Sequence, residues 1–345
     1  MANIVICADG TWNRPEEDLE KDHATNVLKT ARAIRPSVQG VKQHVFYDWG
    51  LGSYHSSVSA GVAGSGIHKN IVDGYRYIVQ NYTNGDNIFL FGFSRGAYTV
   101  RALCGLINNC GIVKRANAKL IEQAWKIYKS KGSQNHPDGE GAKAFRTANC
   151  HATRKVHFVG VWDTVGALGI PFSLMGLLDG KDEFYDTKMG PNVAFARHAL
   201  AIDEQREDFE PTIWTPRPGV DLRQVWFSGV HSDIGGSYGP DKNTGTSVSD
   251  LALGWMSGEA RKAGLGLETF IEDRLTDGTT AKLNKSRKHV FRFKKRLHRD
   301  LTVEKIPTGI HRSVQIRYQS NSDYRPKKLA EMINSVGWAG IDIED

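Results

Sequence analysis

The chain has 345 residues, of which 40% are hydrophobic and 24% are charged. This composition is ordinary for a globular protein, and a chain of this length can bury an extensive core without disulfide support. No run of about 18 apolar residues occurs, which excludes a transmembrane helix. The first residues, MANIVICADG, have no basic segment and do not resemble a Sec signal, so we expect a cytoplasmic protein, with signal-independent secretion left open.

The positive charge is concentrated in one segment. The net charge is +7, and residues 285–299, KSRKHVFRFKKRLHR, hold eight Lys or Arg and no acid. Such a segment attracts anionic surfaces, so we expect peripheral contact with an anionic membrane, the alternative being a solvated face. Aromatic residues at the spacing of nucleic-acid motifs are absent, and we expect no nucleic-acid partner.

The predicted strands and helices alternate along the chain. Apolar runs predict strands at 3–10, 42–52, 87–93, 155–163 and 220–233. Amphipathic spacing predicts helices at 23–36, 67–82, 97–111, 120–130, 193–204 and 248–264. Such alternation is typical of an α/β fold with a mostly parallel central sheet and helices on both faces, here α/β-hydrolase-like. We expect a catalytic domain over 1–270 with a lid-like insertion around 165–190. The less regular, basic extension 271–345 would pack on the same domain.

The stretch Gly92-Phe93-Ser94-Arg95-Gly96 joins a buried strand to a helix. A serine between two glycines at such a junction is typical of a nucleophile on a strained strand-to-helix turn, although a structural turn is the alternative. The backbone N–H of Arg95, at the start of the helix, would stabilise an oxyanion. A second donor would come from Gly10 or Thr11, in the loop after the first strand.

A nucleophilic serine needs an acid and a histidine from later strands. Asp163 ends the strand HFVGVWD, and His231 lies near the end of the predicted strand 220–233, so Ser94, Asp163 and His231 have the order of a hydrolase triad. His311 is the rival base. It lies beside Arg312 and Arg317, and this arginine-rich segment could instead bind a phosphate headgroup.

Other acids lie where strands end. Asp9, Asp48 and Asp233 could support loops or bind a metal, but their pattern does not identify a metal site, and we expect no cofactor. Residues 61–70, GVAGSGIHKN, vaguely resemble a phosphate-binding loop, which would suggest a nucleotide-binding protein. The Gly-Lys-Ser/Thr sequence of that motif is missing.

Taken together, these motifs resemble a known family. They are CADGTWN (7–13), FLFGFSRGAYTVRAL (89–103), GVWDTVGALG (160–169), WFSGVHSDIGGSY (226–238) and IHRSV (310–314). The chain resembles a large, mostly uncharacterised α/β-hydrolase family that includes one class of type VI secretion phospholipase effectors. The resemblance implies serine esterase or phospholipase chemistry, with Ser94, Asp163 and His231 as the triad. Those effectors are often longer, with membrane-docking modules, so this chain resembles their hydrolase core alone, and Ser228 stands where the family motif has proline.

We therefore expect a serine hydrolase that cleaves lipid or small carboxylic esters through an acyl-enzyme. The apolar stretch GIPFSLMGLL (169–178) could form a lid over an acyl-chain pocket or a buried helix. A non-catalytic binding module on a hydrolase fold is the alternative function.

Overall fold

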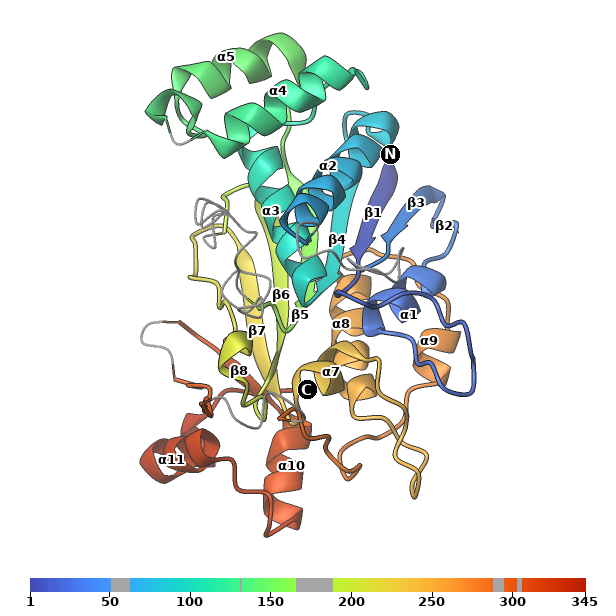
Figure 1. Ribbon diagram of the computed structural model, residues 1–345, viewed down its shortest axis with the longest axis vertical. Coiled ribbons are helices and arrows are strands. Elements are labelled where there is room, and N and C mark those ends of the chain that lie inside the picture. Colours follow the sequence, from blue (N-terminus) through green and yellow to red (C-terminus); the bar gives the residue numbers. More distant parts are fainter. Residues whose placement is uncertain (51–62, 131, 166–188, 288–294, 303–305) are drawn as a thin grey trace.

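The computed structural model describes residues 1–50, 63–130, 132–165, 189–287, 295–302 and 306–345 (Figure 1). These residues form a nine-stranded sheet. Its strands are β1 (Ala2–Ala8), β2 (Ser37–Val38), β3 (Val41–Asp48), β4 (Asn87–Phe93), β5 (Val156–Trp162), β6 (Val193–Ala201), β7 (Asp221–Phe227), β8 (Gly309–His311) and β9 (Ile343–Glu344).

The strand order in the sheet is β2-β3-β1-β4-β5-β6-β7-β8-β9. Every neighbouring pair runs parallel except β2 and β3, which form an antiparallel hairpin at one edge. Parallel strands need crossover connections, and helices supply most of them here. The expectation of an α/β fold with a mostly parallel sheet is confirmed.

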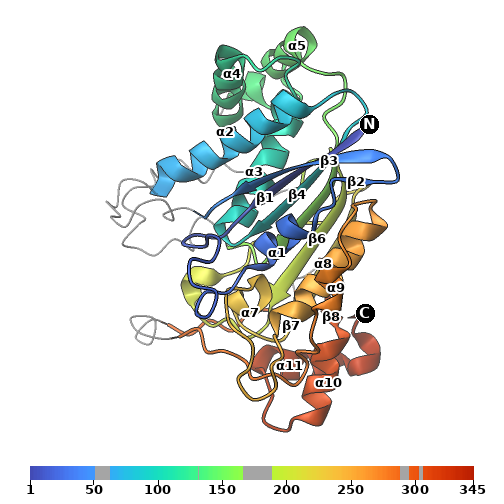
Figure 2. The same cartoon turned by 90° about the vertical axis from the view of Figure 1, so that its right-hand side faces the viewer.

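The helices lie on both faces of the sheet (Figures 1 and 2). They are α1 (Asn26–Ala33), α2 (Ala63–Asn81), α3 (Arg95–Cys110), α4 (Ala118–Lys129), α5 (Glu140–Asn149), α7 (His231–Gly235), α8 (Ser249–Lys262), α9 (Phe270–Asp273), α10 (Arg312–Ser320) and α11 (Lys327–Val336). Side chains of α2, α3, α4 and α5 pack on one face of the sheet, and those of α1, α7, α8 and α9 pack on the other.

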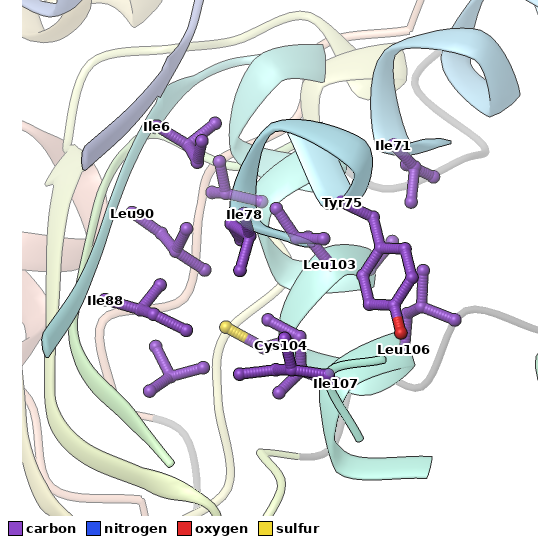
Figure 3. Packing of buried hydrophobic residues seen from close by; sticks show 14 of the residues in the cluster. Ile6, Ile71, Tyr75, Ile78, Ile88, Leu90, Leu103, Cys104, Leu106 and Ile107 are labelled. Carbon is purple, nitrogen blue, oxygen red and sulfur yellow. The ribbon is translucent and has the colours of Figure 1, made fainter. Parts of the chain in front are cut away.

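Alternate residues of the central strands enter opposite core layers. In β4, Ile88 and Leu90 join the layer under α2 and α3 (Figure 3). Phe89 and Phe91 join the layer under α8 on the other face. A strand that is buried on both faces reads as a continuous apolar run, which is why the sequence identified β1, β4 and β5 well. Burying each such side chain contributes about 1.5–3 kcal/mol.

The predicted helix over 193–204 is wrong, because this segment is strand β6. It pairs in parallel with β5 on one side and with β7 on the other. Its sequence, VAFARHALA, is rich in good helix formers, and that propensity misled the prediction. A position between two strands, with buried partners on both faces, overrides the local preference.

The C-terminal residues extend the same sheet. Strands β8 and β9 lie beside β7, and a third cluster of buried side chains joins β6, β7 and β8 to α10 and α11. The central members of that cluster include Trp226, Ile310 and Leu329, all fully buried.

Two sequence expectations concern the region around α2 and the proposed lid. Residues 63–70 lie in helix α2, so Gly64 and Gly66 belong to a helix and not to a phosphate-binding loop. The stretch 169–178 lies outside the described residues, as does most of the expected insertion at 165–190.

In the described part of the chain, no helix is both long and apolar enough to cross a bilayer. All four cysteines are buried and free.

Candidate active site

The carboxyl ends of the central strands meet at one edge of the sheet. The strand register pairs Ala8 with Gly92, and Phe93 with Trp162. Asp9, Ser94 and Asp163 each follow immediately after one of these strands. Their backbones therefore leave the sheet at the same edge, where ligands bind in open α/β sheets.

Ser94 occupies a strained turn between β4 and α3. Its φ is 55° and its ψ is −121°, a conformation that costs a non-glycine residue of the order of 1–3 kcal/mol. The flanking glycines make the turn possible. A Cβ on Gly92 would lie 2.5 Å from the carbonyl oxygen of Gly96, and a Cβ on Gly96 would lie 2.0 Å from that of Ala8. Ser94 forms no side-chain cap of α3, so its hydroxyl is not used to satisfy the helix terminus.

Ser94 is largely buried. Only 9% of its surface is exposed, because the loop after β1 packs against it. A Cβ on Gly10 would lie 3.2 Å from the Cβ of Ser94. The strained turn thus places the serine at the sheet edge, beneath a neighbouring loop.

Asp163 and His231 form a buried hydrogen-bonded pair. His231 Nδ1 lies 2.6 Å from Asp163 Oδ2, and the side chain of Asp163 is fully buried. Asp163 also has a positive φ of 42°, and its Oδ1 accepts a hydrogen bond from the Ala201 N–H. Burial opposes the carboxylate charge, but Arg299 and His231 together hold the pKa of Asp163 well below its ordinary value.

The imidazole of His231 lies between two aromatic rings. Its centroid is 4.6 Å from the ring of Phe93, the residue before Ser94, and 5.0 Å from the ring of Phe209. Burial lowers the pKa of His231 below its ordinary value, and the hydrogen bond to Asp163 opposes that shift. Burial therefore favours the neutral imidazole. Among the described contacts, none is a hydrogen bond between this ring and the Ser94 hydroxyl, a contact that often tightens only when substrate binds.

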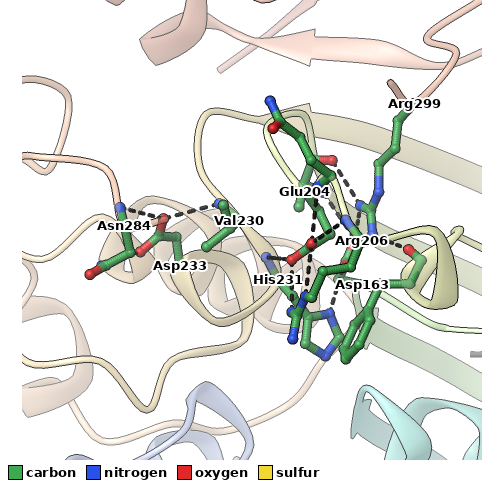
Figure 4. A network of polar contacts seen from close by, with 11 residues as sticks. Asp163, Glu204, Arg206, Val230, His231, Asp233, Asn284 and Arg299 are labelled. Carbon is green, nitrogen blue, oxygen red and sulfur yellow. Dashed lines mark hydrogen bonds and ion pairs between the residues drawn. The ribbon is translucent and has the colours of Figure 1, made fainter. Parts of the chain in front are cut away.

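Two charged residues that sequence reasoning missed complete this cluster (Figure 4). Arg299 donates to Asp163 Oδ1 at 2.6 Å and to Oδ2 at 3.0 Å. Glu204, just after β6, accepts from the His231 backbone N–H at 3.2 Å and from Arg206. Because 193–204 had been predicted as a helix, the acid at its end was not recognised as a strand-end residue.

The expected oxyanion donors come from the loop after β1 and from the start of α3. The Gly10 N–H already donates to Asp9 Oδ1 at 2.7 Å, so it is engaged within its own loop. The hydroxyl of Thr11 is buried without a partner among the described residues. Arg95 is the first residue of α3, where backbone N–H groups have no partner within the helix.

Two of the three acids considered for a metal, Asp9 and Asp233, are engaged in hydrogen bonds within the protein. Asp9 accepts from Thr25 and Tyr47, and burial raises its pKa to about 6. Asp233 accepts from Val230 and Asn284 and so joins two loops. Burial raises the pKa of Asp48 to about 7. No three His, Cys, Asp or Glu side chains converge as metal ligands in the described ranges.

His311 lies elsewhere in the sheet. It caps helix α10 through Ser313, and it stacks on Phe227 of β7 with centroids 4.6 Å apart. Strand β8, which ends at His311, is four strands from β4, or roughly 19 Å. Arg312 is exposed and pairs with Asp345. The imidazole that contacts Asp163 is that of His231.

The basic segment 285–299 divides into different environments. Residues 288–294 lie outside the described part, and Lys295, Arg296 and His298 are exposed. Arg299 is buried against Asp163, so it is not available to an external surface. Membrane contact through the remaining residues stays a prediction.

Comparisons with known proteins agree with the motifs. Residues 2–259 match the family "T6SS, Phospholipase effector Tle1-like, catalytic domain". An uncharacterized protein of Saccharomyces cerevisiae, YEL023C, is 25% identical in an alignment 241 residues long that covers 63% of this chain and 33% of that protein. The chain thus spans about a third of the length of this curated relative.

Two solved structures are similar at low identity. A Tle1 effector, solved bound to the VgrG spike of the type VI secretion system, matches with a TM-score of 0.49 and 15% identity, over 81% of this chain and 77% of that one. An uncharacterized protein from Pseudomonas aeruginosa matches with a TM-score of 0.46 and 17% identity, over 80% of this chain and 47% of that one. Because the family match extends over most of the chain, the protein belongs to the Tle1-like phospholipase effector family and contains its catalytic domain.

Proposed function

We propose that this protein is a serine esterase that hydrolyses the acyl esters of lipids. The observation that carries the proposal is the strained turn at Ser94, which lies at the same sheet edge as the buried Asp163–His231 pair. Backbone strain of this kind persists only where the surrounding structure enforces it, and it concentrates at functional sites. Membership of a family of phospholipase effector domains supports the same chemistry.

In the proposed reaction, Ser94 Oγ attacks the ester carbonyl carbon while its proton passes to Nε2 of His231. The Asp163 carboxylate holds the other imidazole proton on Nδ1, so that Nε2 is the basic nitrogen. His231 then donates its proton to the departing alcohol, which leaves an acyl-enzyme on Ser94. Water attacks that ester, with His231 again as base, and releases the fatty acid.

Negative charge on the former carbonyl oxygen would be stabilised by backbone donors. The Arg95 N–H at the first position of α3 benefits from the partial positive charge at the helix N-terminus. The second donor is Thr11, because the Gly10 N–H is held by Asp9. Each such donor typically accounts for a factor of about 10²–10³ in kcat.

A lipid substrate fits the apolar surface near the site. The segment that follows Gly10 exposes two large apolar side chains, Trp12 at 55% and Leu19 at 83%. Gly10 itself packs against Ser94, so the start of this segment borders the proposed nucleophile. Acyl chains at a membrane surface would contact such residues.

The test is covalent labelling and turnover in Ser94→Ala. A fluorophosphonate should label the wild type at Ser94, and hydrolysis of p-nitrophenyl butyrate and of phosphatidylglycerol vesicles should fall by roughly 10⁴-fold or more in the variant. Ser257→Ala is the matched control, because Ser257 is also buried, with no partner for its hydroxyl in the described part of the chain.

Unchanged turnover in Ser94→Ala would reject the proposed mechanism. A wild type that neither reacts with the probe nor releases fatty acid would instead favour the binding module.

A further inference from the structure

Arg299 is a buried cation that comes from outside the region matched by the family. Its side chain and that of Asp163 are both fully buried. Its guanidinium donates to both carboxylate oxygens of Asp163, to the carbonyl of Ala201 at 2.8 Å and to the carbonyl of Phe209 at 2.5 Å. Arginine is suited to this arrangement because its planar fork matches a carboxylate in two parallel hydrogen bonds.

The chain around Arg299 is fixed to the turn that borders His231. Leu297 N–H donates to the carbonyl of Gln205 at 3.0 Å, and Arg296 forms a β-bridge with Arg206. The same turn carries Phe209, whose ring touches the His231 imidazole edge-on. Residues 295–299 therefore connect directly to the surroundings of the imidazole.

We propose that Arg299 is a positioning residue of the esterase, holding the Asp163 carboxylate in the one orientation and charge state that fixes His231 for proton transfer. This inference rests on the function proposed above and adds to it a residue beyond the family match. Each oxygen of Asp163 accepts from Arg299 and from one further donor, which is Ala201 N–H at Oδ1 and His231 at Oδ2. A carboxylate held by four donors cannot rotate.

The positive charge of Arg299 opposes proton binding by the Asp163–His231 pair. A nearby cation favours the ionised carboxylate and disfavours the imidazolium. Removing it raises the pKa of Asp163, and with it the pH at which the coupled Asp163–His231 pair first takes up a proton. The charged groups around the Asp163–His231 pair are Glu204 and Arg206 after β6, which act on His231, and Arg299 in the C-terminal segment, which contacts Asp163.

The decisive experiment follows the His231 imidazole by ¹⁵N NMR titration beside the pH profile of kcat/KM for p-nitrophenyl butyrate. Arg299→Gln should raise both the His231 midpoint and the acid limb by about one pH unit and lower kcat at least about tenfold. Arg299→Lys keeps the charge but not the fork, so the midpoint should stay near the wild-type value while kcat still falls about tenfold. KM should change little in both variants.

Arg197→Gln is the matched control. Arg197 is also a buried arginine with two acidic partners, Glu259 at 2.5 Å and Asp221 at 3.0 Å, but neither contacts Asp163 or His231. This control should lose stability without moving the His231 midpoint or the acid limb. If Arg299→Gln matches the control in both readouts, Arg299 has only a structural role and the proposal is rejected.

The two proposals can fail separately. If Arg299→Gln does not fold, Arg299→Lys tests the proposal instead. A wild-type kcat in Arg299→Lys would show that the bidentate contact with Asp163 is not needed. If the wild type shows no esterase activity, the proposed function fails. The NMR titration then still reports whether Arg299 sets the protonation of His231, and an unmoved midpoint would reject that as well.

Discussion

Asp163→Asn should destabilise this protein far more than the loss of one hydrogen bond would. The substitution leaves the fully buried guanidinium of Arg299 without its bidentate anion. Leaving one member of a buried ion pair unpaired typically costs about 3–5 kcal/mol. Glu204 is close enough to interact with the Arg299 charge, so a second anion remains, and we expect the lower part of that range, about 3 kcal/mol.

Equilibrium urea unfolding at pH 7 measures this loss directly. Asp221→Asn is the control, because Asp221 also pairs with a buried arginine, Arg197, but is itself 46% exposed. Exposed partners contribute about 0–1 kcal/mol. The double variant Asp163→Asn/Arg299→Met should recover most of the stability, since it removes the orphaned charge, yet it should stay inactive.

The result that refutes this reasoning is an Asp163→Asn variant whose free energy of unfolding lies within about 1 kcal/mol of the wild type. In that case Arg299 would be satisfied by its two carbonyl partners alone, and the ion pair would not be an energetic link between the C-terminal segment and the site.

We make three further predictions, for Gly96, His231 and Asp48, which urea unfolding or steady-state kinetics can test. Gly96→Ala should lower the unfolding free energy by about 1–3 kcal/mol and abolish turnover, because the added Cβ would collide with the Ala8 carbonyl. Gly258→Ala is the control. A Cβ there meets nothing within 4 Å, so the substitution should be neutral or slightly stabilising. Because the pKa of His231 is lowered, the acid limb of kcat/KM should lie below the ordinary value of 6.5, and a midpoint above 6.5 would contradict the burial argument. Asp48 has a folded-state pKa of about 7, above the unfolded value of 3.8, so its ionisation favours unfolding as the pH rises between these values. Asp48→Asn should therefore gain roughly 1–3 kcal/mol over the wild type at pH 8 and little at pH 4, as followed by urea unfolding.

The location of the candidate site could be predicted from the sequence because apolar runs show where the strands end. Ser94 and Asp163 both follow apolar runs that are buried on both faces, and parallel strands bring such ends to one edge. The positive φ angles of these two residues could not be predicted, since neither is glycine. They follow from close packing of neighbouring segments, such as the approach of Gly96 to Ala8.

Strand β6 shows where local reasoning fails. Alanine, arginine and leucine favour helices, but Val193–Ala201 is enclosed by two strands and two helical layers. That error concealed Glu204, which would otherwise have been recognised as an acid at a strand end, like Asp9 and Asp163. Secondary-structure propensity depends on the local sequence alone and does not include the tertiary contacts that a segment will make.

Arg299 was hidden for a different reason. It is the last of eight basic residues in 285–299, and nothing in that run distinguishes a buried arginine from exposed ones such as Arg296. Its burial depends on Asp163, which is 136 residues away in the chain. Only the folded structure brings these two charges together.

The ion pair between Arg299 and Asp163 affects which part of the chain is needed for the proposed active site. The family match ends at residue 259, yet the acid of the Asp163–His231 pair is neutralised by a residue beyond it. A chain without residues 295–299 would bury the Asp163 carboxylate with no adjacent arginine, so the Asp163–His231 pair would take up a proton at a higher pH. Once that proton is bound, the pair can no longer accept the Ser94 proton on which the proposed reaction depends. The C-terminal segment therefore belongs to the proposed active site on electrostatic grounds, in addition to extending the sheet through β8 and β9.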